Sequence, residues 1–187
     1  PILFSGEVDE IIPARSGRRH VLHLLDTILS LPPRERAPET DLGKLLEAGE
    51  GIARRRSLIF LVSDFFSRSG WSEPLRRIAR KHELLGVRLV DPLEQELPDI
   101  GMVYVEDAET GEQLFVDTGD RRFRERFFRE SEEREEGVKR ALVDAGVDTL
   151  EISTEDDLVA SILRFAELRR GRSATLQGGR SRVIPMA

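Results

Sequence analysis

The chain has no cysteine among its 187 residues, and it contains only one tryptophan and one tyrosine. Without cysteine it can form neither disulfides nor metal sites built from thiolates. No apolar run approaches the roughly 20 residues that span a membrane, so we expect no membrane segment in this chain. There is no excess of basic residues either: the net charge is −6, which argues against nucleic acid as a partner. These absences together favour a cytoplasmic domain.

What is present is a regular alternation of strand-like and helix-like segments. Short apolar runs bounded by turn residues predict strands, and apolar residues recurring every three or four positions predict helices. Such alternation favours a three-layer, doubly wound α/β fold with a mostly parallel sheet over residues 1–170. Residues 171–187 lack periodicity, and we expect a flexible tail there. Strands are predicted over 2–4, 7–13, 58–64, 84–91, 101–107, 112–117 and 147–153, and helices over 18–31, 42–55, from about 71, 120–145 and 155–170.

The predicted helix over residues 120–145 is rich in charge. Its apolar stripe, which includes Phe123, Phe127, Val138 and Leu142, should pack on the sheet. Residues 129–137 contain no large apolar side chain. We therefore expect part of this helix to protrude into water.

Residues 57–66, SLIFLVSDFF, place a carboxylate at the end of an apolar run. The run is typical of a strand buried on both faces of a parallel sheet. Ligands of open α/β sheets bind in the crevice at the carboxyl ends of the strands, which makes Asp64 a candidate site residue. An aspartate at a strand end also stabilises loops through local hydrogen bonds, and this structural role stays open.

The combination of several segments resembles the von Willebrand factor A domain, in the version found in the bacterial domain-of-unknown-function family 58. The resemblance rests on ETDLGKLLEAG followed by LIFLVSDF, and on FSGEVDEIIPARSGRRHVLHLL near the start. It continues through WSEPLRRIARKHELLGVRLVDPLEQELPDIGMVYVEDAETGEQLFVDT and LVDAGVDTLEISTEDDLVASILRFAELRR. The resemblance thus extends over residues 1 to about 170.

The resemblance implies a metal-ion-dependent adhesion site at the carboxyl edge of the sheet. By position in the family's motif, Thr40 matches a loop threonine and Asp64 matches the aspartate after the fourth strand. Both would be oxygen ligands of Mg²⁺, which prefers octahedral oxygen coordination and keeps several waters. Thr40 or Asp41 is also well suited to cap the helix that follows, so a capping role for Thr40 remains open.

The sequence departs from the family's pattern in one respect. The Asp-x-Ser-x-Ser motif that supplies three further ligands does not occur in the chain. By the resemblance, the first strand of the family's central sheet and the helix after it are lacking. We therefore expect an amino-terminally incomplete von Willebrand A-like domain, with an incomplete magnesium site.

Two alternatives concern the residues around Asp64. Phe65, Phe66 and Trp71 would form an exposed rim for a protein partner; alternatively, Phe65 and Phe66 would anchor the loop to the core. Asp91 ends the next predicted strand, so that Asp64 and Asp91 would place two carboxylates on one sheet edge. Such a pair can hold a metal ion for phosphoryl transfer or hydrolysis. A turn-forming role of Asp91 before Pro92 is the simpler alternative.

Taken together, the sequence predicts a protein-interaction module and not an enzyme. No Gly-rich phosphate loop, Ser-His-Asp set or His-Glu-x-x-His motif points to catalysis. The resemblance implies an AAA+ ATPase of the MoxR type as the partner. It also implies that the parent protein can be attached to a membrane through segments that precede this domain.

Overall fold

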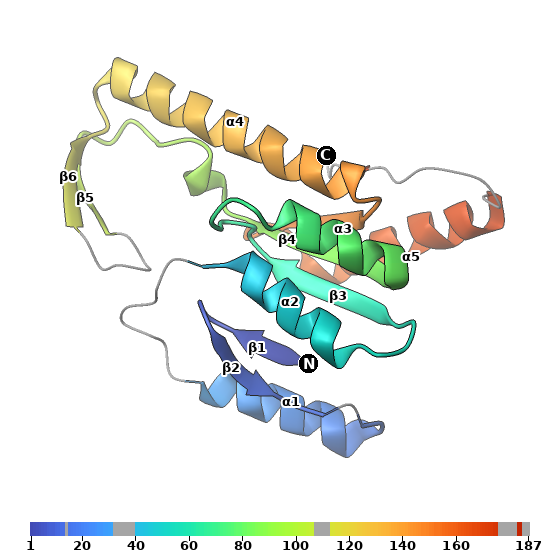
Figure 1. The fold of residues 1–187 in the computed structure, drawn as a ribbon. Coiled ribbons are helices and arrows are strands. Elements are labelled where there is room, and N and C mark those ends of the chain that lie inside the picture. Colours follow the sequence, from blue (N-terminus) through green and yellow to red (C-terminus); the bar gives the residue numbers. More distant parts are fainter. Residues whose placement is uncertain (14, 32–39, 107–112, 176–182, 185–187) are drawn as a thin grey trace.

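The computed structural model describes residues 1–13, 15–31, 40–106, 113–175 and 183–184. The structure alternates strands and helices along most of the chain, as Figure 1 shows. In chain order the elements are β1 (Ile2–Phe4), β2 (Val8–Ile11), α1 (Arg18–Ser30), α2 (Leu42–Ile52), β3 (Leu58–Ser63), α3 (Ser72–Lys81), β4 (Glu83–Val90), the short 3₁₀ helix η1 (Pro92–Glu94), β5 (Met102–Glu106), β6 (Gln113–Asp117), α4 (Arg121–Asp144), β7 (Asp148–Ser153), α5 (Leu158–Thr175) and β8 (Val183–Ile184).

The central sheet is parallel, with the strand order β3-β4-β7-β8. Its register places Ser63 of β3 beside Arg88 of β4, and Arg88 beside Glu151 of β7. Helices connect these strands because a parallel pair cannot be joined by a tight turn. The mixed α/β class with a parallel sheet is therefore confirmed.

Two antiparallel pairs lie outside the central sheet. Strands β1 and β2 form one pair, and β5 and β6 form the other. Both were expected as hairpins from the sequence, and both predictions are confirmed. The turn between β1 and β2 contains Gly6, whose positive φ of 85° is readily adopted only by glycine.

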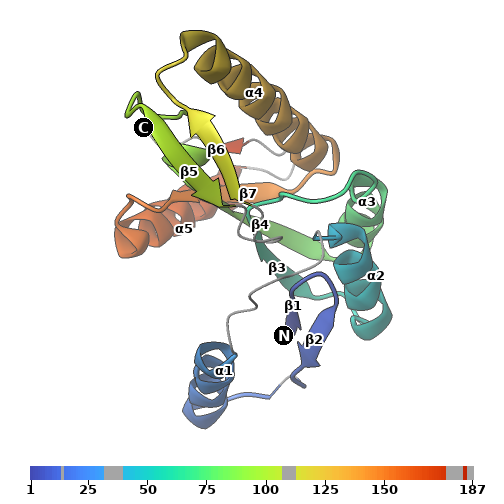
Figure 2. The ribbon, with the colours of Figure 1, turned by 90° about the vertical axis from the view of Figure 1, so that its left-hand side faces the viewer.

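The main core lies between one face of the central sheet and the helices α2, α3 and α4. Figures 1 and 2 show these helices on the same side of the sheet, with α5 on the opposite side. The buried cluster includes residues from all three helices and from β3 and β4, together with three residues from the connecting segments. Its members are Leu42, Leu46, Leu61, Phe65, Trp71, Leu75, Ile78, Leu84, Val138, Leu142 and Val147.

The other face of β3 is bare in the described part of the chain. Phe60 is 61 % exposed, with Leu58 and Val62 similarly open, whereas Leu61 on the core face is 6 % exposed. The expectation that this strand is buried on both faces is therefore wrong. An apolar run shows that the strand is rich in apolar residues, but it does not show that both faces are covered. Helix α5 contacts the sheet at β7 instead of covering β3.

The middle of α4 is attached to the rest of the molecule through polar contacts. Ser131 is buried, and its Oγ donates to the carbonyl of Glu94 at 3.0 Å. Glu135 pairs with Arg88 of the central strand β4. Glu132 and Glu133 are exposed, so part of this stretch faces water as expected, whereas the face that carries Ser131 and Glu135 is attached to the rest of the molecule.

The carboxyl-terminal part differs from the expected tail. Helix α5 continues past residue 170 to Thr175, and Val183–Ile184 pairs with β7 in parallel. The other residues of the predicted tail, 176–182 and 185–187, lie outside the described residues. No helix in the described ranges has both the length and the apolar character that crossing a membrane requires.

Candidate functional site

The site predicted from the sequence lies at the carboxyl edge of the central sheet. Strands β3 and β4 run parallel and end close together, so the residues that follow them share one edge. Asp64 comes directly after β3, and Asp91 directly after β4. Glu94 ends the short helix η1, which begins right after Asp91.

Asp64 fixes the loop that leaves β3. Its Oδ1 accepts a hydrogen bond from the backbone N–H of Phe66 at 2.9 Å, and one from the Ser63 hydroxyl at 3.3 Å. This is a local aspartate turn of the kind that strand ends commonly carry. The structural role left open for Asp64 is therefore present. The side chain is nevertheless exposed.

Hydrogen bonds of Ser67 link Thr40 to the same loop. The Ser67 hydroxyl donates to the Thr40 carbonyl at 3.0 Å and accepts from the N–H of Leu42 at 2.9 Å. The N–H of Arg68 also donates to the Thr40 carbonyl, at 3.1 Å. These bonds tie the start of α2 to the loop after β3. Thr40 and Asp64, which are far apart in sequence, thus come from two segments held together at one edge.

The cap of α2 is Asp41, one of the two residues expected there. Its Oδ1 accepts from the N–H of Lys44 at 3.2 Å. Thr40 therefore stands just outside the helix. A capping role does not account for its position beside the loop.

The carboxylates of Asp64 and Asp91 act on a third carboxylate, Glu94, at this edge. Partial burial raises the pKa of Glu94 above its ordinary value, and the charges of Asp64 and then Asp91 raise it further. Arg134 and Arg88 act in the opposite direction and offset part of this shift. The two carboxylates expected to share the edge are therefore joined by a third, Glu94, which sequence reasoning missed. The feature of the sequence that could have identified Glu94 is its position three residues after the strand-end Asp91, in a turn that begins with a proline.

Asp91 also has a local structural role. Its Oδ1 accepts from the N–H of Leu93 at 2.9 Å and so caps η1. The turn-forming role foreseen for Asp91 is present. It holds Glu94 in place at the same edge.

Most of the predicted aromatic rim is not accessible to a partner protein. Phe65 and Trp71 are buried, 2 % and 8 % exposed, and their ring centroids lie 5.6 Å apart. The prediction that they form an exposed rim is wrong, because both belong to the core and anchor the loop. Phe65 does so in a left-handed backbone conformation, with φ 65°, which is uncommon for a bulky residue.

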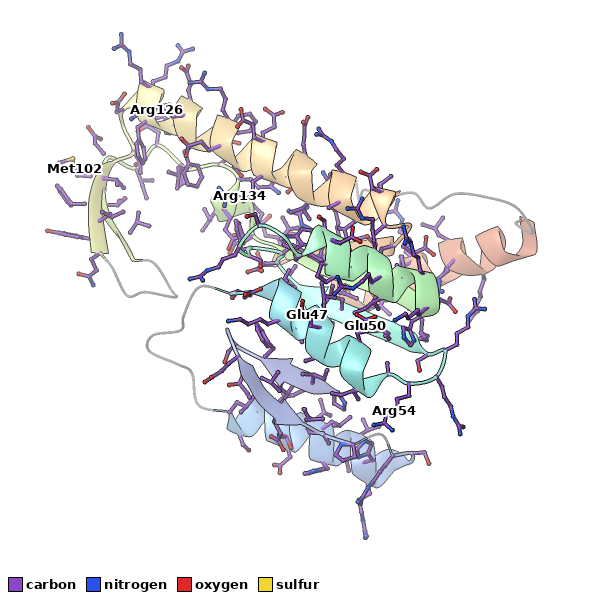
Figure 3. All side chains as sticks on the ribbon, in the orientation of Figure 1. Glu47, Glu50, Arg54, Met102, Arg126 and Arg134 are labelled. Atoms are coloured by element: carbon purple, nitrogen blue, oxygen red, sulfur yellow. The ribbon has the colours of Figure 1, made fainter. Side chains whose placement is uncertain are left out.

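Phe66 is the one member of the predicted rim that stays half-buried. The guanidinium of Arg134, labelled in Figure 3 on the middle of α4, lies 4.6 Å from the centroid of its ring. This cation–π contact links α4 to the loop after β3. A cation thus lies beside the three carboxylates.

The residues at this edge do not complete a magnesium site by themselves. Among the described residues, no group of three or more histidine, aspartate or glutamate side chains is arranged to hold a metal ion. Thr40 and Asp64 supply two oxygen-bearing side chains, and one Asp64 oxygen already accepts two hydrogen bonds. Octahedral Mg²⁺ sites use carboxylates whose oxygens are free to face the ion.

The fold and this edge define a class: a mixed α/β domain whose parallel sheet ends in a cluster of carboxylates beside a loop threonine. The chain belongs to the family described as "Protein of unknown function DUF58", which matches residues 1–137. The assignment to domain-of-unknown-function family 58 that was made from the sequence is thereby confirmed.

Two mycobacterial relatives illustrate the membership. The chain is 33 % identical over 171 residues to "Uncharacterized protein Rv1480" of Mycobacterium tuberculosis, covering 90 % of this chain and 53 % of that protein. It is 36 % identical over 159 residues to "Uncharacterized protein MAV169" of Mycobacterium avium, covering 85 % of this chain and 94 % of that protein. The chain thus spans about half the length of the first of these relatives.

A solved structure shares the fold. The crystal structure of the conserved hypothetical protein BatB from Bacteroides thetaiotaomicron superposes with a TM-score of 0.53, covering 92 % of this chain and 78 % of that one. The sequence identity is 14 %, so the likeness concerns the fold alone.

Proposed function

We propose that this chain is a non-catalytic protein-interaction module of the von Willebrand A type, whose binding edge carries Thr40 and Asp64. The observation that carries the proposal is the way Ser67 holds the Thr40 segment against the loop after Asp64. These bonds hold the segments that carry Thr40 and Asp64 together at the edge where open α/β sheets bind their ligands. A cap or a simple turn requires only one of these segments.

We also propose that a magnesium ion at this edge takes its remaining ligands from residues outside this chain. This part rests on the family resemblance and on the bare side of β3. Strand β3 pairs with β4 on one edge, and within the described residues its other edge has no partner. The exposed side chains of Leu58, Phe60 and Val62 lie along the same strand. A further strand and helix of the parent protein would pair with that edge and cover that face.

The partner that we propose is an AAA+ ATPase of the MoxR type. This choice derives entirely from the family resemblance. The exposed Asp64 and the half-buried Phe66 provide one charged and one apolar contact, which suits recognition of a protein surface.

Calorimetric titration of Mg²⁺ tests the proposal. It uses this chain and a version extended upstream with the parent protein's sequence, each with and without Asp64→Ala. We expect no binding heat from this chain, binding by the extended chain, and loss of that binding in Asp64→Ala. Asp26→Ala, an exposed change on α1, is the matched control and should bind like the extended wild type.

A second measurement addresses the partner. The extended chain is mixed with the MoxR-type ATPase, and the complex is followed by analytical size exclusion with Mg²⁺ and with chelator. We expect a complex that Asp64→Ala or chelator dissociates. If the extended chain binds no Mg²⁺, or if Asp64→Ala binds it as well as the wild type, the metal-dependent adhesion proposal is wrong.

One observation favours an alternative function, a metal-dependent phosphoryl transferase or hydrolase that uses Asp64 and Asp91. The charges of Asp64 and Asp91 both raise the pKa of Glu94, which supports a placement of both carboxylates around Glu94 at this edge. The test is turnover of p-nitrophenyl phosphate with Mg²⁺ by the wild type and by Asp91→Asn. Turnover that Asp91→Asn removes would establish the enzyme and contradict the interaction module.

A further inference from the structure

The hairpin formed by β5 and β6 stands apart from the central sheet. Figures 1 and 2 show it beyond the main body, beside the beginning of α4. It is a sheet of two strands, and within the described residues the outer edges of both strands have no partner. An isolated hairpin of two strands is only marginally stable in water. Something other than strand pairing must therefore hold it in place.

The base of the hairpin is fastened to α4 by Thr118. This side chain is 1 % exposed, and its hydroxyl donates to the Gly101 carbonyl at 2.8 Å and accepts from the N–H of Ile100 at 3.1 Å. Arg124 of α4 donates to the Thr118 carbonyl and pairs with Asp99 at 3.2 Å. The hairpin and the first turns of α4 thus form one unit.

One face of the hairpin is apolar and open. Tyr104 and Phe115 are opposite each other in the register, and their ring centroids lie 4.7 Å apart. Tyr104 is 74 % exposed, and Phe115 and Met102 are more than half exposed. Clustered exposed aromatic residues are typical of the anchoring points of protein interfaces.

The adjoining half of α4 is strongly basic. Residues 121–130 contain five arginines and two glutamates. They stand at the amino-terminal end of the helix, where the macrodipole is positive and arginine is unfavourable. These arginines therefore do not stabilise the helix through its dipole. Arg122 and Arg126 are exposed, and neither forms an ion pair with another residue of the described part of the chain.

We propose that the hairpin surface, made of Met102, Tyr104, Phe115, Arg122 and Arg126, binds an extended acidic segment of a partner protein. Figure 3 places the labelled Met102 and Arg126 at the same end of the molecule. The segment adds to an open edge of the hairpin as a third strand, through backbone hydrogen bonds. Its apolar side chains contact the aromatic face, and its carboxylates meet the arginines. This surface is separate from the edge that carries Asp64.

The open edges of the hairpin favour a protein over a membrane as the partner. Open strand edges need hydrogen-bonding partners, which the hydrocarbon region of a bilayer does not offer. A peptide strand provides such partners along its whole length.

Selection of random peptides displayed on phage, with this chain as bait, tests the proposal. We expect enrichment of peptides that combine acidic residues with alternating β-branched or aromatic residues. An enriched peptide is then synthesised with a fluorescent label, and its affinity is measured by anisotropy. The double variant Arg122→Glu, Arg126→Glu should lower the affinity by at least about tenfold. Tyr104→Ser should lower it to a similar extent.

The matched control is the double variant Arg54→Glu, Arg55→Glu, which changes the net charge equally on the distant segment between α2 and β3. It should bind as the wild type does, and far-UV circular dichroism should show all variants folded. The proposal is overturned if no acidic peptide is enriched, or if both double variants bind the peptide equally. Binding of phosphatidylserine vesicles that depends on Arg122 and Arg126, without peptide binding, would overturn it in favour of a membrane surface.

Discussion

Arg88 of β4 and Glu135 of α4 form a bidentate ion pair in the interior of the molecule. Arg88 Nη1 donates to Glu135 Oε1 at 2.6 Å, and Nη2 donates to Oε2. Nη1 also donates to Glu151 of β7 at 3.2 Å. Arg88 is 6 % exposed, so its charge is almost entirely removed from water. The pair attaches the polar middle of α4 to the two strands at the centre of the sheet.

Replacing Glu135 should destabilise the chain strongly. Glu135→Ala removes the main partner of a buried guanidinium, a change that typically costs about 3–5 kcal/mol. Glu133→Ala, on the exposed side of the same helix, should cost less than about 0.5 kcal/mol. Urea unfolding followed by circular dichroism measures both. The double variant Arg88→Met, Glu135→Leu should recover most of the loss; equal stability of Glu135→Ala and Glu133→Ala would show that the ion pair contributes nothing.

The same pair predicts a loss of stability in acid. Hydrogen bonding from Arg88 lowers the pKa of Glu135 from 4.5 to about 2, although partial burial acts the other way. A lowered folded-state pKa stabilises the fold above the unfolded value, and this contribution disappears between about pH 4.5 and pH 2. Glu94, whose pKa is raised, acts with the opposite sign and favours the fold below its unfolded pKa. Urea unfolding across this range should show a steeper loss for the wild type than for Glu135→Gln, and parallel losses would contradict the prediction.

Neutralising Asp64 should lower the pKa of Glu94. The charge of Asp64 is the largest electrostatic cause of the raised value, after burial. In Asp64→Asn the pKa of Glu94 should move toward its ordinary value, while the effects of burial and of Asp91 remain. Titration of the Glu94 carboxyl carbon by NMR measures the shift. Asp117→Asn, on the hairpin, is the control and should leave the Glu94 pKa unchanged.

The bare face of β3 should tolerate polar residues. Phe60→Thr should change the free energy of unfolding by less than about 1 kcal/mol, because the side chain is already largely in water. Leu61→Ala, on the core face of the same strand, should cost about 2–5 kcal/mol. Urea unfolding measures both, and binding of an apolar dye should decrease in Phe60→Thr. A cost for Phe60→Thr as large as that for Leu61→Ala would mean that this face is covered in solution.

Much of the fold was predictable because its local signals are strong. The helix expected over residues 120–145 is Arg121–Asp144, and its cap is Asp120, whose Oδ1 accepts from the N–H of Arg122. The strand expected from residue 58 is Leu58–Ser63. Caps, turns and apolar runs fix where such elements begin and end. They do not reveal how many layers cover a strand, which is why the bare face of β3 was not foreseen.

The candidate site was less accessible to sequence reasoning. The proximity of the Thr40 segment to the loop after Asp64 depends on the Ser67 hydroxyl, which no spacing rule identifies. The sequence left two places open for Phe65, an exposed rim or the core, and placed Trp71 in the rim. Both rings lie in the core, which their size suits them to fill. The pairing of Arg88 with Glu135 joins residues 47 positions apart and leaves no local pattern.

The register of the central sheet also has a consequence for the order of folding. Arg88 of β4 and Glu151 of β7 are neighbours in the sheet but 63 positions apart in the chain. Closing so long a loop is entropically costly, whereas hairpins and helices form within microseconds from neighbouring residues. The β5–β6 hairpin and α4 come between these two strands in the chain. Once they have formed, the effective loop that must close is shorter. We therefore expect the pairing of β4 with β7 to be a late, rate-limiting event that follows the formation of these local elements.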